Sequence, residues 1–315
     1  MKESQKIIAK NKEVEDLKEK LSDNIKDKEK IVSEKIKKLE EIRERRCYPL
    51  LFDPDTPIDS KLVGKVFYDL RKNYKDCNGT LDVLICSTGG EPDAAYNLAM
   101  LFRKYGSKNL NFIVPRMAKS AATILSCASD KILMTPIAEL GPLDVQIFRL
   151  EIKSDSVEPT VFSPMHVELT LDMIRKEYNE GNESLAKALL ERIQSPILLS
   201  SFIKANEISE QYTTKLLNTR MLKDQKEKVS EISKQLTRGY AHHGFCINIE
   251  EARELGLVVD EIPDDQIDIV NGIQMTQDKI NELKLRIDKL KFEDDSPEIF
   301  MLDSVKEGLE ELLEN

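Results

Sequence analysis

The sequence predicts an α/β fold built around a parallel sheet. Two short apolar runs, Leu81–Ser87 and Asn111–Val114, each lead into small or turn-forming residues and then into a helix-compatible segment. Continuous apolar runs of this length, bounded by turn residues, are typical of strands buried on both faces. Strands that alternate with helices favour parallel pairing through right-handed crossovers. We therefore expect strands at these two runs and helices at Asp93–Tyr105 and Ser120–Ser129.

An N-terminal helical arm is predicted for residues 1–46, which lack proline and glycine and are rich in Lys and Glu. Apolar residues spaced by seven and by four fit an imperfect coiled coil, although a solvated single helix fits equally well. A globular domain is expected over residues 47–265. It begins with a strand at Cys47–Phe52, followed by a helix at Ser60–Lys75 that has Asp59 or Ser60 as its N-cap.

Further along, a short strand is expected at Lys131–Met134, followed by a turn-rich segment, Thr135–Pro142. A helical insertion over about 166–237 should then interrupt the α/β pattern, with helices at Leu169–Glu180, Ser184–Gln194, Pro196–Ser209, Glu210–Leu217 and Lys226–Thr237. A short helix and a final strand within Ile249–Val259 complete the core. Residues 266–315 form a C-terminal helical arm that pairs with the N-terminal arm or with another subunit.

Composition excludes several classes of function. A formal net charge of −10 with 33% charged residues disfavours nucleic-acid or anionic-membrane binding. No run of about 18 apolar residues predicts a membrane span, and the first residues lack the apolar core of a secretory signal. The five cysteines are scattered and lack metal-ligand spacing. The chain is therefore expected to be cytoplasmic, with reduced thiols, no metal and no cofactor.

Ser120 is the leading candidate for a catalytic residue. It would stand at the start of a buried helix, where unpaired backbone N–H groups and the helix dipole attract negative charge. Gly89 and Gly90, at the end of the neighbouring strand, would let a substrate backbone approach and would offer further N–H donors. This pattern predicts a nucleophile beside an oxyanion hole. The alternative is that Ser120 only caps the helix, a role for which serine is favoured.

Three motifs carry a resemblance to a known family: Ser87-Thr-Gly-Gly-Glu-Pro-Asp-Ala-Ala95, Pro115-Arg-Met-Ala-Lys-Ser-Ala-Ala-Thr123 and Glu139-Leu-Gly-Pro-Leu-Asp-Val-Gln146. Together they resemble the serine dehydrogenase proteinase family, whose distant relatives are the Clp protease proteolytic subunit and signal peptide peptidase A. The resemblance runs from about Cys47 to Ile262. It implies a ClpP/crotonase-like fold of repeated β-β-α units, with helical arms added at both ends, and serine peptidase activity.

The resemblance also implies a triad. The family is described by the order Ser, Asp, His, which matches Ser120, Asp144 and His243 here. Relative to the Clp subunit the two supporting roles look exchanged, because Asp144 stands where a His is expected and His243 where an Asp is expected. A triad is defined by geometry and not by chain order, so this exchange is physically admissible. His166, expected in a loop, and His242 are alternative bases.

Backbone groups around the nucleophile take their expected roles from the same family. The N–H groups of Gly89 and Ala121 would form the oxyanion hole. Gly90 and Lys119 would line the substrate site. Ala122 departs from the family pattern, which has Gly at that position.

Other mechanisms and functions remain open at this stage. A Ser–Lys dyad, as in signal peptide peptidase A, would need a lysine from the insertion, where Lys176 and Lys187 are candidates. A catalytically silent scaffold that binds partners through its arms is the main alternative in function, and an acyl-coenzyme A enzyme of the crotonase superfamily is disfavoured. We expect a peptide or unfolded-protein substrate, a homo-oligomer, and a coiled-coil or unfoldase partner.

Overall fold

The computed structural model describes residues 2–53, 56–143, 147–152, 157–162, 164–192 and 196–293. The chain divides into two compact units. One comprises residues 36–274, and the other comprises residues 1–35 together with residues 275–315.

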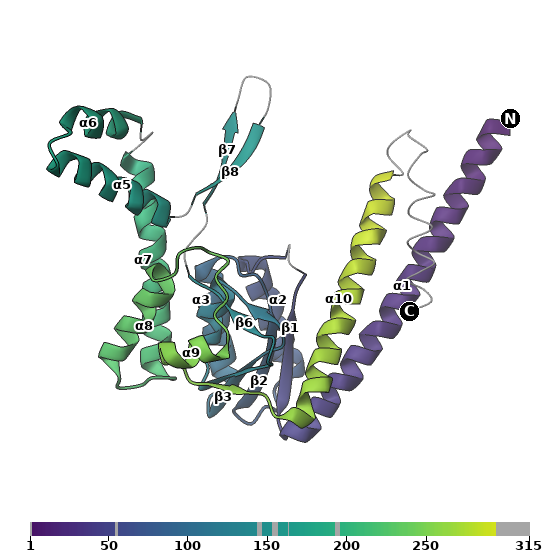
Figure 1. Cartoon of the computed structure of the whole chain (residues 1–315). Coiled ribbons are helices and arrows are strands. Elements are labelled where there is room, and N and C mark those ends of the chain that lie inside the picture. Colours follow the sequence, from purple (N-terminus) through teal and green to yellow (C-terminus); the bar gives the residue numbers. More distant parts are fainter. Residues whose placement is uncertain are drawn as a thin grey trace. The chain divides into compact units, whose positions relative to one another are not determined.

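A parallel five-stranded sheet, counted over the described ranges, is the centre of the larger unit, in the order β1-β2-β3-β5-β9 (Figure 1). Its strands are β1 (Arg46–Leu51), β2 (Thr80–Cys86), β3 (Asn109–Val114), β5 (Lys131–Met134) and β9 (Val259–Glu261). Every neighbouring pair is parallel. The predicted α/β class is therefore confirmed, and the apolar runs form strands because both faces of the sheet are covered.

Helices connect these strands in the expected order. They are α2 (Ser60–Asn73), α3 (Pro92–Tyr105), α4 (Ala121–Ser126) and α9 (Ile249–Leu255). Asp59 is the N-cap of α2, and its carboxylate accepts the Leu62 N–H at 2.8 Å. Phe102 of α3 packs edge-on against Phe112 of β3, with ring centroids 6.0 Å apart. Such contacts between helix and sheet form the hydrophobic core.

Two further sheets lie outside this core sheet. Strands β4 (Met117–Ala118) and β6 (Glu139–Leu140) pair in parallel, and an antiparallel bridge joins Leu140 to Ile247. Strands β7 (Ile147–Ile152) and β8 (Val157–Phe162) form an antiparallel hairpin. The sequence interpretation missed this hairpin, because its strands mix charged and apolar residues and include Pro159.

The insertion is helical, as expected, although one boundary was wrong. Its helices are α5 (Pro164–Asn179), α6 (Glu183–Arg192), α7 (Pro196–Thr219) and α8 (Lys226–Arg238). The two helices expected at 196–209 and 210–217 are one helix, because the Ser-Glu sequence between them contains no helix breaker. Helix α7 packs beside α8 and against α3 and α4 (Figure 1). Arg103 of α3 fixes this contact by donating to the Leu216 carbonyl at 2.7 Å.

The smaller unit pairs the two arms. Helices α1 (Lys2–Arg43) and α10 (Asp264–Glu293) each contribute one part to it. Leu21 of α1 and Ile280 of α10 are both 0% exposed, and Lys284 of α10 lies 3.3 Å from the Glu29 carboxylate of α1. The N-terminal arm thus packs against the C-terminal arm. Of the described helices, none is both long enough and apolar enough to cross a membrane.

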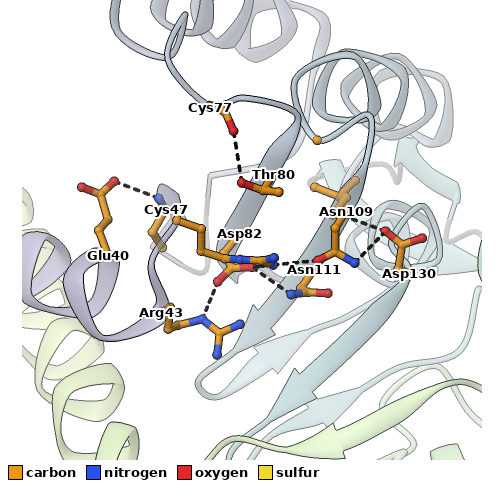
Figure 2. A network of polar contacts seen from close by, with 12 residues as sticks. Glu40, Arg43, Cys47, Cys77, Thr80, Asp82, Asn109, Asn111 and Asp130 are labelled. Carbon is orange, nitrogen blue, oxygen red and sulfur yellow. Dashed lines mark hydrogen bonds and ion pairs between the residues drawn. The ribbon is translucent and has the colours of Figure 1, made fainter.

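The amino ends of the strands meet in a buried polar network (Figure 2). Asp82 of β2 is 0% exposed and is paired with two arginines at the end of α1, Arg43 and Arg45. The Asn111 side-chain amide donates to the same carboxylate at 3.0 Å. Arg43 also donates to Gln266 of α10 at 3.0 Å. Within the larger unit, the last turn of α1 and the first turn of α10 are therefore joined to this polar network.

Candidate active site

Ser120 lies at a sharp turn where the chain passes from β4 into helix α4. Its backbone has a φ of 52° and a ψ of −121°, a conformation that glycine adopts easily and that other residues adopt only under strain. Ser120 occupies the N-cap position, but its side chain makes no capping hydrogen bond. The prediction that Ser120 only caps the helix is therefore wrong. Ser120 is half-buried at this turn.

Gly89 lies directly against this turn. A side chain at Gly89, whose φ is 115°, would come within 2.8 Å of both the Lys119 carbonyl oxygen and Ser120 Cβ. Gly90 is needed for a different reason, because a side chain there would come within 2.4 Å of the Ile58 backbone. Because they lack side chains, Gly89 and Gly90 let the Ser120 turn and the Ile58 backbone approach the end of β2, in addition to any substrate.

The backbone donors expected for the oxyanion hole lie beside Ser120. Ala121 is the first residue of α4, where an N–H group has no carbonyl in the preceding helical turn. The Gly89 N–H donates to the hydroxyl of Ser87, which is buried, at 3.1 Å. Sequence analysis did not single out Ser87, although its place two residues before the first glycine of the motif was a usable signal. Ser87 fixes the orientation of the Gly89 amide.

The loop that carries His243 is joined to the same turn through a ladder of short backbone pairings. Ser87 bridges Ala118, β4 pairs with β6, and Leu140 exchanges two hydrogen bonds of 2.9 and 3.1 Å with Ile247. His243 is half-buried and comes four residues before Ile247, whereas His242 is exposed. Residues separated by more than a hundred positions thus meet at the Ser120 turn.

The other predicted polar residues have different outcomes. Asp144 lies outside the described residues. The chain leading to it is held in place by Thr123 of α4, whose hydroxyl donates to the Gly141 carbonyl at 2.9 Å. His166 was expected in a loop, but it lies in the first turn of α5, because Pro164 begins that helix.

The lysines proposed for a Ser–Lys dyad lie on exposed helix surfaces. Lys176 of α5 is 71% exposed and lies 3.9 Å from the Glu180 carboxylate. Lys187 of α6 is also exposed, and its side chain borders a hollow between α5 and α6. Neither side chain is buried in the way that a lysine acting as the base of a dyad would be.

Lys119, beside the nucleophile, is engaged in a cluster that the sequence did not reveal. Its ammonium lies 2.9 Å from the Glu139 carboxylate of β6. Burial raises the pKa of Glu139, but hydrogen bonds from Cys246 and Lys119, with the charges of Lys119 and Arg116, bring it below its usual value. The hydrogen bond to Glu139, assisted by burial, raises the pKa of the Cys246 thiol. The Lys119 ammonium is therefore paired with the Glu139 carboxylate.

Two curated proteins of one organism are similar to part of the chain. No protein-family model matches the chain. It is 29% identical over 180 residues to uncharacterized protein MJ0137 of Methanocaldococcus jannaschii, covering 57% of this chain and 53% of that protein. A second protein of that organism, MJ1495, is 26% identical over 179 residues, covering 57% of this chain and 51% of that protein. The chain spans about half the length of these curated relatives.

Solved structures with a similar chain course are peptidases. A mutant of the 1510-N membrane-bound stomatin-specific protease aligns with a TM-score of 0.42 and 13% identity, covering 71% of this chain and 83% of that chain. ClpP1 from Listeria monocytogenes aligns with a TM-score of 0.40 and 13% identity, covering 72% and 98% of the two chains. With TM-scores below 0.5, these similarities do not by themselves assign an activity.

Proposed function

We propose that the chain is a serine peptidase that hydrolyses peptide bonds of peptides or unfolded proteins. Ser120 is its nucleophile, His243 its general base, and Asp144 the carboxylate that orients the base. The backbone N–H groups of Gly89 and Ala121 stabilise the oxyanion. Gly90 and Lys119 border the substrate site.

One observation carries the proposal: the strained backbone of Ser120. A conformation with positive φ costs a non-glycine residue about 1–3 kcal/mol and is most common at functional sites. The same strain exposes a nucleophilic serine at the strand-to-helix turn of many hydrolases. A serine that only capped α4 would accept a backbone N–H, and Ser120 does not.

The chemistry follows from the groups around that turn. Ser120 Oγ attacks the peptide carbonyl carbon while its proton passes to the His243 imidazole. The tetrahedral oxyanion accepts hydrogen bonds from Ala121 N–H and from Gly89 N–H, which exchanges its Ser87 acceptor for the substrate oxygen. The C–N bond then breaks, and the imidazole gives its proton to the leaving amine. Water releases the acyl group by the same sequence of proton transfers.

A fluorophosphonate serine-hydrolase probe tests the proposal. The wild-type chain is expected to become covalently labelled, and Ser120→Ala should remove the labelling completely because the attacking oxygen is gone. His243→Ala should slow labelling by several orders of magnitude, since the triad acts as a unit. Asp144→Asn should slow it about 10⁴-fold if this residue orients the imidazole. Intact-mass spectrometry measures each rate.

Two variants serve as matched controls. Ser126→Ala removes a buried hydroxyl from the same helix, and His166→Ala removes a histidine from outside the proposed triad. Both should label at the wild-type rate. Absence of labelling in the wild-type chain would contradict the peptidase proposal and favour the scaffold. Labelling that survives in Ser120→Ala would assign a different nucleophile.

The proposal extends to the setting of the enzyme. We infer a cytoplasmic homo-oligomer in which the cysteines, none of which forms a disulfide within the described residues, stay reduced. The paired arms offer a surface for a coiled-coil or unfoldase partner. Light-scattering measurement of the mass in solution tests the oligomer, and a monomeric mass would contradict it.

A further inference from the structure

Three side chains close to Ser120 form a second, charged cluster: Lys119, Glu139 and Cys246, called here the Lys119 cluster. The Lys119 ammonium lies 2.9 Å from Glu139 Oε1 and donates to the Gly244 carbonyl at 3.4 Å. The Cys246 thiol hydrogen-bonds the Glu139 carboxylate. The Lys119 and Glu139 side chains are only 18% and 25% exposed, so their contact is partly shielded from solvent.

Each member comes from a different segment of the proposed site. Lys119 immediately precedes the nucleophile, Glu139 belongs to β6, and Cys246 ends the loop 241–246 that carries His243. Two backbone hydrogen bonds fasten this loop at its base, where Ile247 pairs with Leu140. Within the loop, the Phe245 N–H donates to the His242 carbonyl at 3.1 Å, which forms a local turn. The Lys119 cluster thus supplies contacts between the loop and the nucleophile turn.

We propose that Lys119 and Glu139 are positioning residues that hold the loop of His243 against the Ser120 turn, so that the imidazole can receive the serine proton. The inference rests on the proposed peptidase function. Lys119 reaches the loop directly through the Gly244 carbonyl, and Glu139 reaches it through Cys246. Because both contacts fall within the three residues that follow His243, they restrict the backbone on its C-terminal side.

Electrostatics keep the cluster intact near neutral pH. Glu139 remains ionised because Cys246, Lys119 and Arg116 outweigh the effect of its burial, and the thiol remains a protonated donor. Gly141 adds a steric restraint, since a side chain there would come within 3.1 Å of the Lys119 side chain. The close packing fixes the direction in which the ammonium points.

Hydrogen exchange tests the mechanical part of the inference without any need for activity. In full-length Ser120→Ala protein, adding Lys119→Met or Glu139→Gln should speed amide exchange in residues 241–246 about tenfold and leave β2 and β3 unchanged. The matched control is Lys131→Met, which breaks an exposed ion pair with Asp260 on the same domain. Exchange that stays at the starting rate in both cluster variants would overturn the inference.

The reactivity of Cys246 tests whether the charges interact as described. Cys246 is exposed, whereas the other cysteines are buried, so Ellman's reagent should react with it first. Glu139→Gln should lower the apparent pKa of the thiol and speed the reaction at pH 7.5, because the hydrogen-bonding carboxylate is lost. Lys119→Met should raise the pKa and slow the reaction. Changes of the same sign in both variants would indicate general loosening and contradict the cluster.

Labelling kinetics separate the inference from the function on which it rests. With Ser120 and His243 intact, Lys119→Met and Glu139→Gln should reduce the fluorophosphonate labelling rate about 10- to 100-fold, the scale for a misplaced catalytic group. Lys119→Arg, which keeps the charge, should restore much of it. A wild-type chain that labels at the same rate as both variants would overturn the inference alone. A wild-type chain that does not label at all would overturn the peptidase function and the positioning role with it.

Discussion

The two ends of the parallel sheet differ in how their polar groups are used. At the amino ends of the strands, Asp82 is fully buried and each carboxylate oxygen has donors, from Arg43, Arg45 and Asn111 (Figure 2). At the carboxyl ends, Ser120 is half-buried, strained and without a capping partner. Buried charge is tolerated at the first end because it is fully paired. At the second end, the backbone strain at Ser120 remains, and the serine side chain does not cap α4.

Within this one sheet, the amino ends of the strands serve stability and the carboxyl ends serve the proposed chemistry. Ligands of open parallel sheets bind at the carboxyl ends of the strands, where connecting loops can be shaped for function. The amino ends can instead hold structural polar contacts. Arg43 of α1 and Gln266 of α10 both belong to the polar network there. Substitutions at the two ends should therefore fail in different ways.

The largest effect on stability is expected at the amino end. Asp82→Ala leaves two partly buried guanidinium groups without their fully buried carboxylate and should lower the free energy of unfolding by about 3–5 kcal/mol. Asp76→Ala removes an exposed carboxylate that pairs with Arg46 and should cost less than about 1 kcal/mol. Urea denaturation of both variants measures the contrast. Equal losses of unfolding free energy in the two variants would show that the burial of Asp82 does not increase its contribution to stability.

An intermediate effect on stability is expected at Gly89, where the carboxyl end of β2 packs closely against the Ser120 turn. Gly89→Ala places a methyl group against Ser120 Cβ at positive φ and should cost about 2–3 kcal/mol, as well as slow fluorophosphonate labelling. Gly64→Ala lies within α2 with no atom within 4 Å of the new methyl group, and it should instead stabilise the chain by about 0.5–1 kcal/mol. Denaturation midpoints compare the two. A stabilising Gly89→Ala would contradict the close approach.

The smallest effect has the opposite sign. Ser120→Gly relieves the strain at the nucleophile and should raise the free energy of unfolding by about 1 kcal/mol while labelling is lost. Asn78→Gly relieves a similar positive φ of 51° in a turn outside the proposed site, and labelling should be retained. Thermal unfolding measures the gain. Destabilisation by Ser120→Gly would show that the side chain supports the turn and that the strain argument is wrong.

Much of the fold could be predicted from the sequence because local signals agreed with the tertiary context. The runs at Leu81–Ser87 and Asn111–Val114 became β2 and β3, since strands covered on both faces need continuous apolar sequence. Local chemistry limited the N-cap of α2 to Asp59 or Ser60, and the structure shows that it is Asp59. The β7–β8 hairpin was missed and α7 was divided in two, because neither has a distinctive periodicity or turn signal.

The sequence by itself determined the alternation of strands and helices and the choice of Ser120, Gly89 and Gly90, because short-range patterns and backbone freedom decide these features. Only the tertiary structure decided that Gly90 accommodates Ile58, that Ser87 holds the Gly89 amide, and that Lys119 pairs with Glu139. It also decided that the loop of His243 reaches the Ser120 turn through Leu140 and Ile247. Such contacts join residues far apart in the chain, and local sequence carries no record of which distant partner the folded backbone brings within hydrogen-bonding distance.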